Sequence, residues 1–98
     1  GDAMTREKFL DTAAFEAGLQ ADGFAPGGTN SKDAGLFVDT HSHPFDVRAL
    51  VLQGQVTITC GDQARTYQAG DVLELARNIA HSEQFGPEGY TFLLGRRS

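Results

Sequence analysis

The chain has 98 residues, a formal net charge of −5 and a single cysteine; 40% of its residues are hydrophobic and 21% are charged. This composition is typical of one soluble globular domain and excludes a disordered chain. The acidic balance argues against binding to nucleic acid, since the only basic cluster is Arg96-Arg97, which we interpret as a solvated tail. One cysteine excludes an intramolecular disulfide and no apolar run is long enough to span a membrane, so we expect a cytoplasmic protein.

Residues 5–20 carry apolar side chains at roughly helical spacing, which predicts one or two short helices. Asp22-Gly23 and the following Pro26-Gly27-Gly28 end this pattern. We therefore expect residues 1–34 to be an N-terminal helical segment and linker that lies against the outside of the following domain. The side chains expected to make that contact are Phe9, Phe15 and Leu19.

From residue 36 onward, short runs of β-branched and apolar residues alternate with glycine, aspartate and asparagine, which predicts an all-β domain over residues 35–98. Turn residues at 61–62, 69–71 and 86–89 predict tight reversals between antiparallel strands. Seven or eight strands fit the pattern. The candidates cover residues 36–43, 47–52, 55–60, 64–68, 72–75, 80–85 and 90–94.

The chain's three histidines are His41, His43 and His81. The first two are one residue apart in a predicted strand, so their side chains share one face of the sheet. Neutral imidazole is the commonest metal ligand, and this pairing favours a metal site inside a barrel.

The three histidines stand at fixed distances along the sequence from three glycines. The first pair lies between Gly35 and Gly54, and His81 follows Gly70 by eleven residues. This spacing resembles the two sequence motifs of the cupin superfamily, over about half of the chain. The resemblance implies a cupin-like antiparallel β-barrel, a jelly roll or double-stranded β-helix, in which the three histidines bind a metal.

The chain departs from the family pattern at four positions. Cupins commonly carry a glutamate ligand at the position of Val47, so one carboxylate donor is missing here. Ala76 and Asn78 replace the proline and glycine of the second motif, and Phe85 replaces its asparagine. Asn78 can take the left-handed backbone conformation that the glycine would supply, so we expect the turn to persist.

Two acidic residues are candidates to replace the missing carboxylate. Asp46 lies on the opposite strand face from the histidines, unless Pro44 marks a bulge that turns it inward. Glu83 lies two residues after His81 and therefore on its face. A carboxylate buried near three imidazoles needs a cation or a proton to be tolerated; the alternative is that Glu83 sits in water at the barrel mouth.

Three imidazoles suit Zn²⁺, Fe²⁺, Ni²⁺ or Cu²⁺ and leave a coordination position open, as in catalytic sites. The resemblance implies dioxygenase, isomerase or lyase chemistry on a small molecule, with Glu83 as the catalytic acid or base and no organic cofactor. The alternative is a sensor module that binds a metal or small ligand without chemistry. Free strand edges in a small barrel also predict a homodimer.

Overall fold

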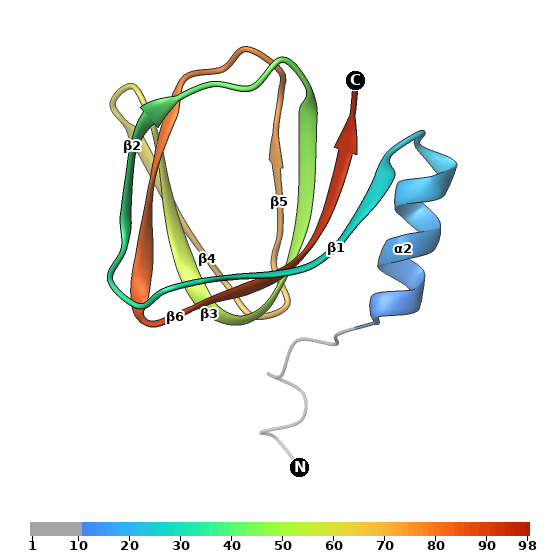
Figure 1. The fold of residues 1–98 in the computed structure, drawn as a ribbon, viewed down its shortest axis with the longest axis horizontal. Helices are drawn as coiled ribbons and strands as arrows, with labels where there is room; N and C mark the ends of the chain where they lie inside the picture. Colours follow the sequence, from blue (N-terminus) through green and yellow to red (C-terminus); the bar gives the residue numbers. More distant parts are fainter. Residues whose placement is uncertain (1–10) are drawn as a thin grey trace.

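The computed structural model describes residues 11–98 (Figure 1). One helix precedes six strands in the described part of the chain, and the strands belong to one continuous antiparallel sheet. The one helix described in residues 11–98 is not long and apolar enough to cross a bilayer. The elements are α2 (Thr12–Ala21), β1 (Ala25–Lys32), β2 (Phe37–His41), β3 (Asp46–Cys60), β4 (Gln63–Gln68), β5 (Val72–Leu75) and β6 (His81–Arg97).

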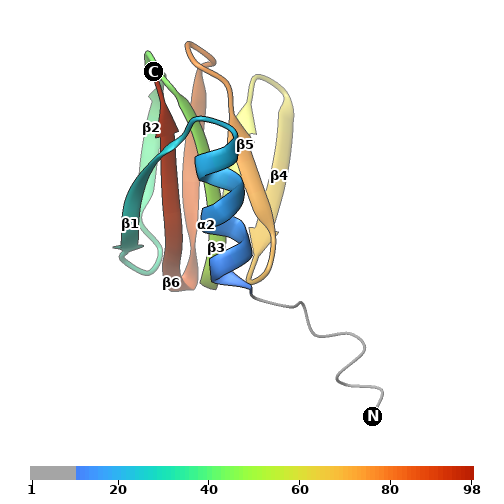
Figure 2. The same ribbon diagram turned by 90° about the vertical axis from the view of Figure 1, so that its right-hand side faces the viewer.

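The predicted N-terminal helix is confirmed over α2. It begins where the side chain of Asp11 accepts a hydrogen bond from the backbone N–H of Ala14 at 2.9 Å. It ends before Gly23, whose positive φ of 79° turns the chain away. Leu19 is buried against Gly95 of β6, and Figure 2 shows α2 on the outer side of the barrel, as expected. Phe15 is half-buried, and Phe9 lies outside the described residues.

Two long strands, β3 and β6, form the framework of the barrel. They pair with each other along almost their whole lengths and bend together, so that each contributes to two facing walls (Figure 1). One wall has the order β1-β6-β3-β5 and contains the C-terminal half of β6. The other has the order β2-β6-β3-β4 and contains the N-terminal half of β6.

The bend corrects one prediction made from the turn residues at 86–89. These residues lie inside β6 and do not reverse the chain. Pairing jumps from Gly54 opposite Tyr90 to Val56 opposite Phe85, so the extra residues of β6 bulge where the strands fold over. The segments 80–85 and 90–94 are therefore parts of one strand, as are 47–52 and 55–60.

The turn at 61–62 is confirmed as a two-residue hairpin, because Cys60 pairs with Gln63. The turn at 69–71 exists, but it is not a reversal: β4 and β5 follow each other along the same edge of β3. Val51 exchanges backbone hydrogen bonds with the turn, at 2.9 Å to each of Gly70 and Asp71, which keeps the two strands in line. The described residues thus form six strands instead of seven or eight.

Residues 25–32, expected to belong to a linker, form β1. This segment contains two glycines and a proline and has no β-branched residue except Thr29, so its composition does not predict a strand. It pairs with residues 90–96 of β6 nonetheless, because β6 offers a free edge along which the backbone groups of β1 are satisfied. Tertiary pairing overrides local propensity here.

The core lies between the two walls. Phe85, Tyr90 and Phe92 stack in sequence, with ring centroids 5.5 and 4.4 Å apart. Aliphatic side chains from β3 and β5 pack around them. The remaining buried members of this cluster are Ala49, Val51, Val56, Ile58 and Leu73.

The bend generates a prediction about Gly54. This residue has φ of 72°, and a Cβ there would overlap the carbonyl oxygen of Gly89. We expect Gly54→Ala to lower the free energy of unfolding by about 3 kcal/mol or more, because backbone strain adds to a collision with main-chain atoms. Denaturant unfolding followed by circular dichroism measures this loss.

Gly61→Ala is the matched control. Gly61 also has positive φ, 60°, but a Cβ there meets no atom within 4 Å. Gly61→Ala should lower the free energy of unfolding by only roughly 1–2 kcal/mol, which is the cost of the left-handed conformation for a residue with a Cβ. If both variants lose the same free energy of unfolding, the close approach of Gly54 to Gly89 at the bend does not constrain residue 54.

Candidate metal centre

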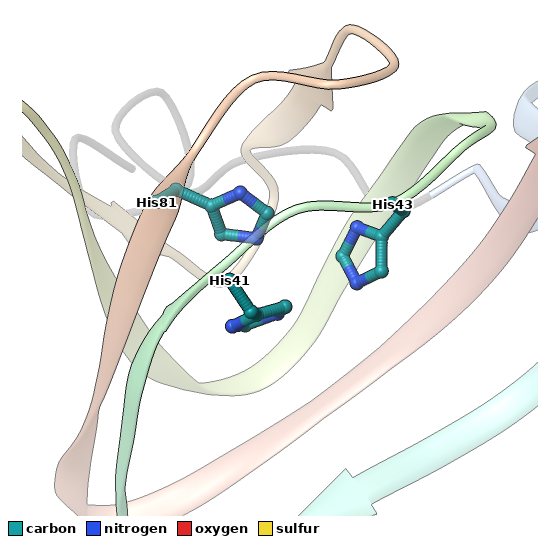
Figure 3. Close-up of side chains that lie close together, drawn as sticks. All are labelled: His41, His43 and His81. Carbon is teal, nitrogen blue, oxygen red and sulfur yellow. The ribbon is translucent and has the colours of Figure 1, made fainter.

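The fold brings the three histidines together at one end of the barrel (Figure 3). His41 ends β2, His43 lies in the connection from β2 to β3, and His81 begins β6. The ring centroids are 4.5 Å apart for His41 and His81, 4.8 Å for His41 and His43, and 5.2 Å for His43 and His81. One nitrogen of each ring lies within 4.8 Å of the others, which is a donor set that can close on one metal ion.

Two connections hold the histidines in place. His41 pairs with His81 at the junction of β2 and β6. The backbone N–H of Asn78 donates to the carbonyl of His43 at 2.7 Å, which ties the β2–β3 connection to the turn before β6. Asn78 has φ of 65°, so its predicted left-handed conformation is confirmed.

Backbone carbonyls set the tautomers of two rings. Nδ1 of His41 lies 2.8 Å from the carbonyl oxygen of Asp39, and Nδ1 of His81 lies 3.0 Å from that of Ile79. A carbonyl can only accept, so each Nδ1 donates, and in the neutral ring Nε2 keeps its lone pair. His81 is 1% exposed, and its Nε2 makes no hydrogen bond. A buried polar atom left without a partner is costly and usually has a functional reason.

Glu83 points into the same space. Its Oε2 lies 3.2 Å from Nε2 of His41 and 3.4 Å from Nε2 of His81, and its side chain is 19% exposed. The two-residue strand period that separates it from His81 places both on the inner face of β6. A carboxylate oxygen and two nitrogen lone pairs repel one another unless a proton or a metal ion lies between them.

Asp46 does not join the cluster, so the alternative in which Pro44 turns it inward is wrong. Its carboxylate accepts hydrogen bonds from the backbone N–H and guanidinium of Arg77, at 2.9 to 3.3 Å, and from Arg97 at 3.0 and 3.2 Å. Hydrogen bonds from Arg77, followed by those from Arg97, hold the pKa of Asp46 well below its ordinary value. This network ties β3 to the end of β6 and to the 76–80 turn.

His41, His43 and Glu83 line a cavity of about 250 Å³ between the two walls. Val47, at the position of the usual cupin glutamate, contributes apolar surface to it. Burial lowers the pKa of His43, and the charges of His41 and His81 lower it further. Burial raises the pKa of Tyr90 well above its ordinary value, with a smaller contribution from Glu83. The other apolar lining residues include Val38, Phe45, Ala49, Ile58, Leu73, Leu75, Phe92 and Leu94.

The C-terminal basic pair is not a solvated tail. Both residues belong to β6: Arg97 pairs with Asp46 at 3.0 Å, whereas Arg96 lines the cavity. The signal for this was present in the sequence, since Tyr90, Phe92 and Leu94 alternate with the period of a strand and Arg96 is the next position. Lys32 of β1 also lines the cavity, and no sequence feature singled it out.

Comparison with solved structures identifies the fold. A cupin superfamily protein from Desulfitobacterium hafniense is 25% identical with a TM-score of 0.61, over 71% of this chain and 64% of that one. The DMSP lyase DddQ from Ruegeria pomeroyi is 21% identical with a TM-score of 0.64, over 71% and 36% of the two chains. A protein of unknown function from Rhizobium leguminosarum is 14% identical with a TM-score of 0.68, over 93% and 98%.

These similarities confirm that the chain has the cupin fold, also known as the double-stranded β-helix. The chain spans less than two thirds of the length of the Desulfitobacterium protein and about a third of the lyase. The sequence matches no protein-family model, and it matches no curated protein sequence.

The network around Asp46 generates a prediction about acid stability. The folded pKa of Asp46 is below its ordinary value of 3.8, so its ionised form stabilises the fold fully above that pH. This contribution is lost as the pH falls from 3.8 toward the lower folded value. We therefore expect wild type to be more stable than Asp46→Asn near neutral pH, with a difference that shrinks below pH 3.8.

Urea unfolding of both proteins at a series of pH values measures the difference. Asp62→Asn, which removes an exposed carboxylate in the β3–β4 turn, controls for the change in net charge. If the difference in the free energy of unfolding between wild type and Asp46→Asn stays constant across the acid range, the ionised form of Asp46 does not stabilise the fold as expected.

Proposed function

We propose that this cupin-fold chain is a metal-binding protein in which His41, His43 and His81 hold a divalent transition metal at the end of the barrel cavity. The metal is Zn²⁺, Fe²⁺, Ni²⁺ or Cu²⁺, and the bound site binds or transforms a small molecule, in a reaction of dioxygenase, isomerase or lyase type. The observation that carries this proposal is the buried Nε2 of His81, which has a fixed tautomer and no hydrogen-bond partner.

The donor chemistry supports a cation at this point. The oxygen of Glu83 lies within 3.4 Å of the Nε2 atoms of His41 and His81, and the carbonyls of Asp39 and Ile79 hold the two rings from behind. Metal-bound histidines characteristically donate their second ring N–H to such an outer acceptor. A positive ion between the three acceptors converts their repulsion into attraction.

The side chains around the site have separable roles. A divalent metal bound there would polarise a substrate oxygen or lower the pKa of a bound water. Glu83 is placed to accept or donate a proton next to the histidines. Phe45, Leu75 and Leu94 give the cavity wall apolar surface, and a ligand seated against that surface would displace water and strengthen the electrostatic interactions beside it.

A second candidate function is a module that binds metal without catalysis. The closeness of Glu83 to two of the rings favours it, because a carboxylate that binds the metal as a fourth protein ligand closes the site. In that case no position remains for a substrate on a four-coordinate ion. The small-molecule ligand, the homodimer and the cytoplasmic location stay predictions for both candidates.

The first prediction concerns His81. We expect wild type to bind one divalent ion per chain, and His81→Ala to bind it more than about 100-fold more weakly, since the loss of a direct ligand exceeds the effect of outer-sphere changes. Elemental analysis after loading and dialysis, together with calorimetric titration of Zn²⁺ and Ni²⁺, measures both quantities.

Ser82→Ala is the matched control, because Ser82 is the next residue of β6 and does not line the cavity. It should bind metal like wild type. Thermal unfolding with and without metal checks that the variants fold, and the metal should raise the melting temperature of wild type and of Ser82→Ala only. Undiminished metal binding by His81→Ala would overturn the proposed site.

The second prediction separates the two functions through Glu83. If Glu83 is the acid or base, Glu83→Gln keeps one metal per chain, because three imidazoles remain, while turnover of a substrate found by screening falls at least about 100-fold. If Glu83 is chiefly a ligand, the variant loses metal affinity instead. We expect the first outcome; metal loss in the absence of any wild-type turnover favours the binding module.

A further inference from the structure

The inner face of β6 ends in a cation at the mouth of the cavity. Arg96 continues the inward alternation of Tyr90, Phe92 and Leu94. Its guanidinium lies over the ring of Phe45, 5.0 Å from the centroid, and Phe45 stacks on His43 with centroids 5.0 Å apart. Arg96 is therefore held in contact with an aromatic wall that leads directly to the histidine cluster.

Arg96 has no carboxylate partner in the described part of the chain. By contrast, Arg48, Arg77 and Arg97 each form an ion pair with at least one aspartate or glutamate. Lys32 of β1 also lines the cavity, but it lies opposite Tyr90, whereas Arg96 lies opposite Ala25, so the two cations are at different ends of the β1–β6 pairing. Aromatic stacking orients the Arg96 fork while its N–H donors remain free for a ligand.

The charge near Arg96 on the cavity wall is positive. Glu83 is the one acidic residue that lines the cavity, and its Oε2 lies beside Nε2 of His41 and Nε2 of His81, at 3.2 and 3.4 Å. Arg96 therefore faces the cavity without a carboxylate partner, in a chain whose net charge is −5. An unpaired cation on an otherwise acidic protein attracts anions to this part of the cavity wall.

We infer that the ligand of this cavity is a small organic anion whose carboxylate or phosphate group pairs with Arg96. Its apolar body lies against Phe45, Leu75 and Leu94, and its other end faces the histidine cluster. The cavity of about 250 Å³ holds the volume of roughly eight waters, so the anion is small. The inference deepens the proposed function and rests on it for what happens at the histidines.

Matched probes test the charged end. Zn²⁺-loaded protein and metal-free protein are titrated by NMR with butanoate, with its neutral amide, and with propyl phosphate at millimolar concentrations. We expect an anionic probe to bind and the amide not to bind. Arg96→Gln should lower the affinity for the anionic probe about tenfold or more. Arg96→Lys should lower this affinity less, because lysine keeps the charge but lacks the planar fork.

Arg65→Gln is the control for net charge. Arg65 is exposed on β4, stacks on Tyr67 and does not line the cavity, so its loss should leave the binding of the anionic probe unchanged. Stronger binding of butanoate or of propyl phosphate identifies which acid group the mouth prefers. Arg96→Lys gives a second variant of the same position should Arg96→Gln fail to fold.

The outcomes separate the two proposals. Equal binding of butanoate and its amide, no binding of any probe, or an anion affinity unaffected by Arg96→Gln overturns the inference. If Zn²⁺ binds normally in those experiments, the proposed metal site survives that failure. If the anion binds through Arg96 while no metal binds, the anion site stands and the proposed metal function fails.

Discussion

The pairing of β3 with β6 is the constraint on which the rest of the structure depends. Both strands run through both walls, so the bend between Gly54 and Gly89 determines how the walls face each other. It also determines what lies between them, because Glu83 belongs to one half of β6 and Arg96 to the other. Glu83 and Arg96 thus reach the cavity from opposite walls although they belong to a single strand.

Strand alternation made much of the site predictable. The two-residue period placed Glu83 on the face of His81, and it placed Asp46 on the face opposite to His41 and His43. Both positions agree with the structure. The bend was not predictable by the same reasoning, because glycine and proline at 86–89 suit a reversal and a bulge equally well. Strand β1 was missed for a different reason: its pairing comes from the free edge of β6 and not from its own residues.

The cavity carries two polar regions of opposite preference. Glu83 and the histidines are mutually attractive only when a proton or a cation joins them, so this region favours positive charge. Arg96, over the ring of Phe45, favours negative charge. A metal ion at the histidines and a ligand with its anionic group at Arg96 would together leave neither region with an unpaired charge.

The replacement of the usual glutamate by Val47 bears on this arrangement. A carboxylate at 47 would come from β3, in the wall opposite to His81, and would occupy the cavity between the metal donors and Arg96. With valine there, the remaining carboxylate comes from the strand that carries His81, two residues away, and the β3 wall is apolar. An acidic group close to Arg96 would also neutralise it. The loss of the glutamate therefore leaves the cation at the mouth free for an anionic ligand while Glu83 keeps a carboxylate at the histidines.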